Sequence, residues 1–174
     1  MSIIPCPTKG NRFANDLYAL SGGKQVPYLY DPNIDFGSRG SRQIIEYLFL
    51  QYRGIPAPAA MLPSLSGMLR AGLASAVRLT GKLDAVASRE PEEPLVLYSF
   101  ESSPFARLVR ERLCQLELPY RLINLGKQQW ADMGPAAMRI KPGKYKPLPN
   151  SKRDEFLKKY GKVQVPFLID PNTD

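Results

Sequence analysis

The amino-acid sequence predicts an α/β fold, and three observations lead to this prediction. A nine-residue segment that begins at Gln25 returns at Gln164 with seven identical positions and a constant offset of 139 residues. Residues 95–124 have the pattern strand, helix, strand. The 17 prolines among 174 residues argue against a chain built from long helices. Together these features indicate parts of two copies of one α/β module.

The first copy is expected to span residues 1–54. Gly22 is a natural helix stop, and a short strand is expected from Val26-Pro27 to an Asp-Pro-Asn turn at residues 31–33. A helix is predicted over residues 41–50, with Ser41 as its N-cap. This copy therefore has the pattern of a helix, a strand and a second helix.

A linker with a possible helix is expected between the two copies, over residues 55–94. Prolines punctuate its first part, and apolar residues at helical spacing suggest a helix over 64–86. The segment Glu90-Pro91-Glu92-Glu93-Pro94 marks the boundary to the second copy. That copy is expected to span residues 95–174.

The second copy opens with a predicted buried strand, Leu95–Phe100. Ser103 is the expected N-cap of a helix that has Pro104 at its first position and ends near Leu116. A strand over 119–124, a helix over 154–160 and a strand over 164–169 are predicted to follow. The side chains expected on the inner face of the first helix are Phe105, Leu108, Val109, Leu113 and Leu116.

Residues 126–153 are expected to form a basic surface insertion, because proline, glycine and charge leave little to bury. Residues 95–174 carry 14 bases and 8 acids. Such an excess is compatible with an acidic ligand, an anionic membrane or a nucleic acid. The stretch has no glycine–aromatic pattern of an RNA-recognition motif, so nucleic acid remains the least favoured of these ligands.

Composition excludes several kinds of chemistry. The chain has no histidine, which rules out an imidazole base or a histidine metal ligand. Its two cysteines, Cys6 and Cys114, are too few for a disulfide framework or a four-cysteine zinc site, and no metal is expected. No run of 18 uncharged apolar residues and no signal-peptide pattern is present. We therefore expect a soluble intracellular protein, cytoplasmic or plastid.

Several segments carry a resemblance to a known family. The turn Ser103-Pro104-Phe105, the strand after Val165-Pro166, and their partial repeat at Val26-Pro27 resemble the thioredoxin-like, glutaredoxin-like N-terminal domain of glutathione S-transferases. The similarity is greatest to plant, algal and cyanobacterial proteins that carry two such modules in tandem. Against that pattern the first copy is partial, the second lacks its last strand and helix, and the chain is expected to be truncated at both ends.

The resemblance implies a binding site for glutathione. In the family, the Val-Pro peptide is cis and its backbone holds the cysteinyl part of glutathione, which assigns Val165-Pro166 and Val26-Pro27 here. The helix start carries the reactive group, which assigns Ser103 as the catalytic candidate with Pro104 and Phe105 beside it. An acid–serine pair binds the γ-glutamyl group, and Ser41 keeps the serine of this pair while Gly40 replaces the acid.

The helix start departs from the redox members of the family. They carry a cysteine at one or both ends of the motif, where this chain has Ser103-Pro104-Phe105-Ala106. Dithiol exchange is therefore not expected there, and Ala106→Cys is expected to create a thiol of lowered pKa. The favoured function is binding of glutathione, as a cosubstrate, or of a related thiol, with weak or no catalysis. The alternatives are a non-catalytic protein-interaction or scaffolding module and, less favoured, an anion or nucleic-acid binder.

Overall fold

The computed structural model describes residues 1–7, 9–64, 84–134 and 143–173. Contacts divide the chain into two units, one formed by Met1–Pro7 with Ala85–Asp174 and the other by Thr8–Asp84. We call them the sheet unit and the hairpin unit and describe each by itself.

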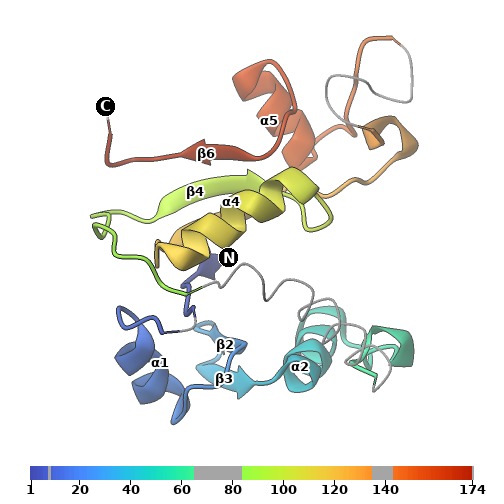
Figure 1. Cartoon of the computed structure of the whole chain (residues 1–174). Helices are drawn as coiled ribbons and strands as arrows, with labels where there is room; N and C mark the ends of the chain where they lie inside the picture. The colour runs from blue at the N-terminus through green and yellow to red at the C-terminus, as the bar shows by residue number, and fades with distance from the viewer. Residues whose placement is uncertain (8, 65–83, 135–142, 174) are drawn as a thin grey trace. The chain divides into compact units, whose positions relative to one another are not determined.

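The sheet unit contains a four-stranded sheet in the order β1-β5-β4-β6 (Figure 1). Strands β4 (Leu95–Ser99) and β5 (Tyr120–Asn124) are parallel, which requires a crossover, and helix α4 (Pro104–Gln115) provides it. Strand β6 (Phe167–Ile169) runs antiparallel to β4. The strand–helix–strand order predicted for residues 95–124 is confirmed, with β4 inside the sheet.

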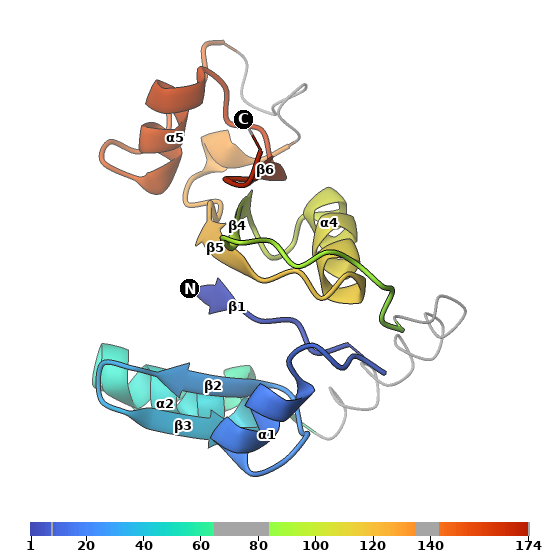
Figure 2. The same ribbon diagram turned by 90° about the vertical axis from the view of Figure 1, so that its left-hand side faces the viewer.

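Helices α4 and α5 (Lys152–Tyr160) lie on opposite faces of this sheet (Figure 2). The alternation of side chains along β4 and β5 produces two apolar clusters, one for each face. The cluster under α4 comprises Leu95, Leu97, Leu113 and Tyr120. The cluster under α5 comprises Leu125, Phe156 and Val163. The sheet is therefore covered on both faces, as expected for an α/β fold.

The inner face of α4 differs from the predicted one. Phe105 and Leu108 are 66% and 62% exposed, whereas Ala106 and Leu113 are buried. Ala106 has no exposed surface, and its small side chain lets the first turn of α4 pack closely. The helical spacing of the apolar residues was right, but the helix turns a neighbouring stripe toward the sheet.

The hairpin unit contains α1 (Ala14–Ser21), a two-stranded antiparallel sheet of β2 (Tyr28–Asp31) and β3 (Phe36–Arg39), α2 (Ser41–Arg53) and a short 3₁₀ helix η1 (Ala59–Met61). Asp31 locks the turn to α2, because its carboxylate accepts hydrogen bonds from the Tyr47 and Tyr52 hydroxyls and from Asn33. A side chain at Gly37 would collide with Tyr28, whose hydroxyl oxygen would lie 2.1 Å from the added Cβ.

The repeat has the same local structure in both units. Gly22 ends α1 and Gly161 ends α5, both with positive φ, at 68° and 73°. In each copy the strand begins directly after the Val-Pro pair, since proline has no N–H for a sheet. The glycine stops predicted from the sequence are thus confirmed.

Ser41 is not the N-cap of α2. That position belongs to Gly40, whose φ of 83° suits glycine, and no side chain caps this helix. The Gly40 N–H instead donates to the Pro27 carbonyl at 3.1 Å. This bond fixes the start of α2 beside the Val-Pro pair of the same unit.

The division into units differs from the predicted one at the N-terminus. Ser2–Ile3 forms β1, which pairs antiparallel with β5, so Met1–Pro7 groups with the sheet unit. Most of the helix expected over 64–86 lies outside the described residues. Within the parts of the chain that the structure describes, no helix is long and apolar enough to cross a membrane.

Candidate functional site

A cleft of about 710 Å³ lies in the sheet unit, where the start of α4 faces the segment before β6. Five of the predicted site residues line it together: Ser103, Pro104, Phe105, Val165 and Pro166. The other lining residues are Phe100, Ser102, Lys127, Asp132, Gly134, Arg153, Val163 and Gln164. Residues more than 60 positions apart in sequence thus meet at one cleft, as the resemblance implied.

Ser103 forms the N-cap of α4. Its Oγ accepts a hydrogen bond from the Ala106 N–H at 3.2 Å, and Pro104 occupies the first turn, where its missing N–H costs nothing. Only 3% of Ser103 is exposed. The hydroxyl therefore has a structural role as a cap, and its proton is the only part left to donate to a ligand.

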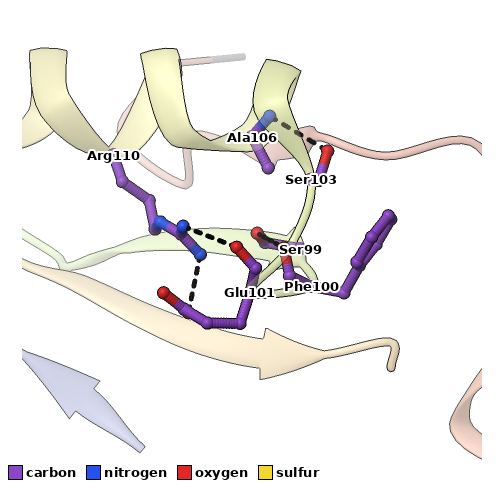
Figure 3. A network of polar contacts seen from close by, with 6 residues as sticks. All are labelled: Ser99, Phe100, Glu101, Ser103, Ala106 and Arg110. Carbon is purple, nitrogen blue, oxygen red and sulfur yellow. Dashed lines mark hydrogen bonds and ion pairs between the residues drawn. The ribbon is translucent and has the colours of Figure 1, made fainter. Parts of the chain in front are cut away.

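The turn before Ser103 is held by Arg110 (Figure 3). The Arg110 guanidinium donates to the Glu101 carboxylate at 2.8 Å and to the Glu101 backbone carbonyl at 3.1 Å. Because Arg110 lies on the second turn of α4, these bonds tie the β4–α4 turn to the helix that follows it. The position of Ser103 is thereby fixed from both sides.

The opposite wall of the cleft is formed by the segment before β6. The Val165–Pro166 peptide bond is cis, as is Val26–Pro27 in the hairpin unit. Val165 packs against the buried cluster of Leu125, Phe156 and Val163. This wall is therefore anchored to α5 and to the end of β5.

A buried polar network, which sequence reasoning missed, completes the cleft. Asp132 ends the 3₁₀ helix η2 (Trp130–Asp132) and is 1% exposed. Its carboxylate accepts the Tyr145 hydroxyl at 2.5 Å and the backbone N–H of Gln128 at 2.9 Å. Tyr145 in turn accepts a bond from Arg153, which is 4% exposed, at 3.4 Å.

The expectation that residues 126–153 have little to bury does not hold for the described parts of this segment. Asp132 and Arg153 are buried, and Tyr145 packs against the cluster under α5. Buried polar groups are stable only with partners, and here each one has them. An acid isolated in a strongly basic stretch was the available signal, since Asp132 is the only acid between Lys127 and Arg153.

The network changes the acidity of its members. Burial alone would raise the pKa of Asp132, but the bonds from Tyr145 and Gln128, with the nearby Arg153 charge, hold this pKa below its ordinary value. Burial and the Asp132 carboxylate raise the pKa of Tyr145. Near neutral pH the network therefore contains a carboxylate, a neutral phenol and a guanidinium.

Three predicted site residues, Val26, Pro27 and Ser41, belong to the hairpin unit. The bond from Gly40 to the Pro27 carbonyl brings the Val-Pro pair and the start of α2 together within that unit. All three side chains are exposed. They do not contribute to the cleft of the sheet unit.

The two cysteines lie outside the cleft. Both are half-buried, and burial together with Glu117 raises the pKa of Cys114. A raised pKa disfavours the thiolate, so Cys114 has the character of a packing residue. Among the described residues, no group of three potential histidine, cysteine or acidic ligands could hold a metal ion.

Residues 97–174 match the model of a protein family described as "Glutathione S-transferase, N-terminal domain". The matched part begins inside β4 and includes the whole cleft, and it amounts to a little under half of the chain. The search of curated proteins and the search of solved structures gave no match.

The family match and the architecture of the sheet unit agree. A mixed sheet with helices on both faces fits the thioredoxin-like fold of a glutathione S-transferase N-terminal domain. Such a domain is consistent with glutathione or another small thiol as its ligand. Fold and family do not by themselves assign a reaction.

Proposed function

We propose that the sheet unit binds glutathione or a related small thiol in the cleft between Ser103–Phe105 and Val165–Pro166, with weak or no catalysis. The observation that carries this proposal is the meeting of both family segments at one cleft of about 710 Å³. A cavity of this size is within the range of small-molecule sites. The family match over residues 97–174 supports the class of ligand.

The weak catalysis in this proposal rests on the start of α4. The motif Ser103-Pro104-Phe105-Ala106 offers no thiol, and the Ser103 hydroxyl is almost fully buried. One charge-assisted hydrogen bond to a bound thiolate contributes about 1.5–3 kcal/mol, and geometry limits it further here. Glutathione would act as a cosubstrate only through that single hydroxyl.

A direct binding measurement tests the proposal. Isothermal titration with glutathione is expected to show binding to the wild-type chain, while the rate of conjugation to 1-chloro-2,4-dinitrobenzene stays close to the uncatalysed rate. Ser102→Trp, which adds a large side chain at the exposed rim of the cleft, is expected to weaken binding. Thr173→Trp, exposed and outside this cleft, is the matched control. Equal affinity of both variants would contradict binding in the cleft.

A second candidate function is protein interaction without catalysis. Phe105 and Leu108 are 66% and 62% exposed on one side of α4, where the sequence predicted buried residues. Exposed apolar side chains grouped on a helix are a common feature of interaction surfaces. The basic residues of 126–153 also keep anion or nucleic-acid binding as a third, less favoured candidate.

The tandem arrangement is part of the proposal. We infer that residues 1–54 derive from a partial copy of the same module. The repeat of Gln25–Asn33 at Gln164–Asn172 supports this, as do the glycine stop, the Val-Pro pair and the short strand that both copies share. The hairpin unit would then be a remnant of a second binding domain.

A further inference from the structure

Arg153 occupies an unusual position for a charged side chain, in the wall of the cleft and with only 4% of its surface exposed. Its Nε–H donates to the backbone carbonyls of Leu125 and Gly126, at 3.0 and 3.1 Å. Nη1 donates to the Tyr145 hydroxyl at 3.4 Å. The other N–H groups of the guanidinium have no hydrogen-bond partner among the described residues.

A purely structural role does not account for this geometry. Two carbonyls and one hydroxyl use only part of the five-donor guanidinium, and no carboxylate of the described residues makes a direct ion pair with it. A buried guanidinium normally has a carboxylate partner, because desolvation of its charge is costly. The cleft is the side from which such a partner can arrive.

Asp132 and Tyr145 hold Arg153 in this orientation. Tyr145 donates to Asp132 and accepts from Arg153, so its hydroxyl connects the acid to the guanidinium. Backbone N–H groups of Gln128 and Gln129 fix the Asp132 carboxylate in turn. The guanidinium is therefore preorganised, which lowers the entropy lost when it binds a ligand.

The charges around the cleft select the kind of anion. Lys127 and Arg153 both lie over the ring of Phe100, 5.2 and 5.9 Å from its centroid. With Asp132 the three charged groups in the cleft wall sum to about one positive charge, which one monoanionic group neutralises. A carboxylate meets that requirement, and its two oxygens match the paired N–H groups of arginine. A phosphate dianion would leave a negative excess.

We propose that Arg153 binds a carboxylate of the cleft ligand, with Asp132 and Tyr145 as positioning residues. This inference rests on the proposed function and narrows its ligand to thiols that carry a free carboxylate. Lys127 supports the same group from the exposed side of Phe100. The cleft thus discriminates by a fixed guanidinium at one end and by the start of α4 at the other.

Titrations with two probes test this assignment. Glutathione has free carboxylates, and glutathione diethyl ester keeps the thiol but has both carboxylates esterified. Wild type is expected to bind glutathione about tenfold or more tightly than the diester, the effect of one charge-assisted hydrogen bond. Arg153→Met is expected to abolish this preference without weakening diester binding. Lys159→Gln, which removes one exposed charge of α5 outside the cleft, is expected to retain it.

Two further measurements guard against a folding defect in Arg153→Met. Tyr145→Phe removes only the connecting hydroxyl and is expected to reduce the preference for glutathione by a few fold. In wild type, the ¹⁵N resonance of the Arg153 Nε–H is expected to shift with glutathione and not with the diester.

The outcomes separate the two proposals. Equal affinity of wild type for both probes, or a preference that survives Arg153→Met, overturns the assignment of Arg153 and leaves thiol binding intact. Absence of binding to either probe overturns the proposed function itself and the carboxylate assignment with it. An unchanged Arg153 resonance at saturating glutathione also contradicts the assignment.

Discussion

Arg110 and Glu101 are joined twice, once through the Glu101 carboxylate at 2.8 Å and once through its backbone carbonyl at 3.1 Å (Figure 3). The two bonds differ in their surroundings, because the carboxylate end is 84% exposed while the Arg110 side chain is 16% exposed. An exposed ion pair contributes little, whereas a bond to a backbone carbonyl orders the turn itself. Substitution of either residue separates the two contributions.

Arg110→Met is expected to destabilise the sheet unit by about 1–2 kcal/mol, because the bond to the Glu101 carbonyl is lost together with the ion pair. Glu101→Gln is expected to cost less than about 1 kcal/mol, because it weakens only the exposed ion pair. Urea unfolding monitored by circular dichroism measures both. Equal losses in the two variants would show that the carbonyl bond does not hold the turn.

Ser103→Ala is expected to lower stability by about 1 kcal/mol, since the Ala106 N–H loses its cap. It is expected to leave conjugation to 1-chloro-2,4-dinitrobenzene unchanged at a very low rate. Ser102→Ala is the matched control, because Ser102 is exposed next to Ser103. A clearly measurable wild-type conjugation rate that disappears in Ser103→Ala would refute the binding-only interpretation and favour a transferase.

Cysteine substitutions at the start of α4 distinguish access from electrostatics. The structure changes the expectation for Ala106→Cys, because Ala106 has no exposed surface and does not line the cleft. A thiol there is expected to react slowly with iodoacetamide. Ser103→Cys, which lines the cleft at the N-terminus of α4, is expected to react faster, with a pKa below the ordinary cysteine value of about 8.5.

Mass spectrometry of the labelled peptides measures these rates and separates them from the reactions of Cys6 and Cys114. The pH dependence of labelling gives the pKa of each introduced thiol. Faster labelling at position 106 than at position 103 would contradict the packing of α4 described above.

The stability of the hairpin unit is expected to depend on Asp31 at acid pH. Hydrogen bonds from the Tyr47 and Tyr52 hydroxyls lower the pKa of Asp31 to about 2. A folded-state pKa below the unfolded value of about 3.9 stabilises the unit above that value, and this contribution is lost as pH falls toward 2. Asp31→Asn is expected to lower the melting temperature at pH 7 and to flatten its decrease between pH 4 and pH 2.

Asp16→Asn is the control for this titration, because Asp16 is an exposed acid on α1 of the same unit. Circular dichroism melts at half-unit pH intervals give the comparison. Parallel pH profiles for wild type and Asp31→Asn would show that the tyrosine bonds do not stabilise the carboxylate.

Local chemistry made much of the fold predictable from the sequence. A glycine that allows positive φ ends a helix wherever it occurs, which placed the ends of α1 and α5 at Gly22 and Gly161. A serine followed by proline marks a helix start, which placed Ser103 at the cap of α4. The meeting of Ser103 and Val165 at one cleft was an expectation from the family resemblance, and periodicity alone does not provide it.

The tertiary structure decided the features that depend on contacts between distant residues. The apolar residues of α4 permit more than one buried stripe, and packing against β4 selected the one with Ala106 and Leu113, leaving Phe105 and Leu108 exposed. Likewise, proline, glycine and lysine around Asp132 indicate a solvated loop, until Tyr145 and Arg153 supply the partners that make its burial stable. The sequence by itself determined where the elements begin and end, because those signals act over a few residues. Which faces are buried, and which charge faces the cleft, depended on partners that only the folded chain brings together.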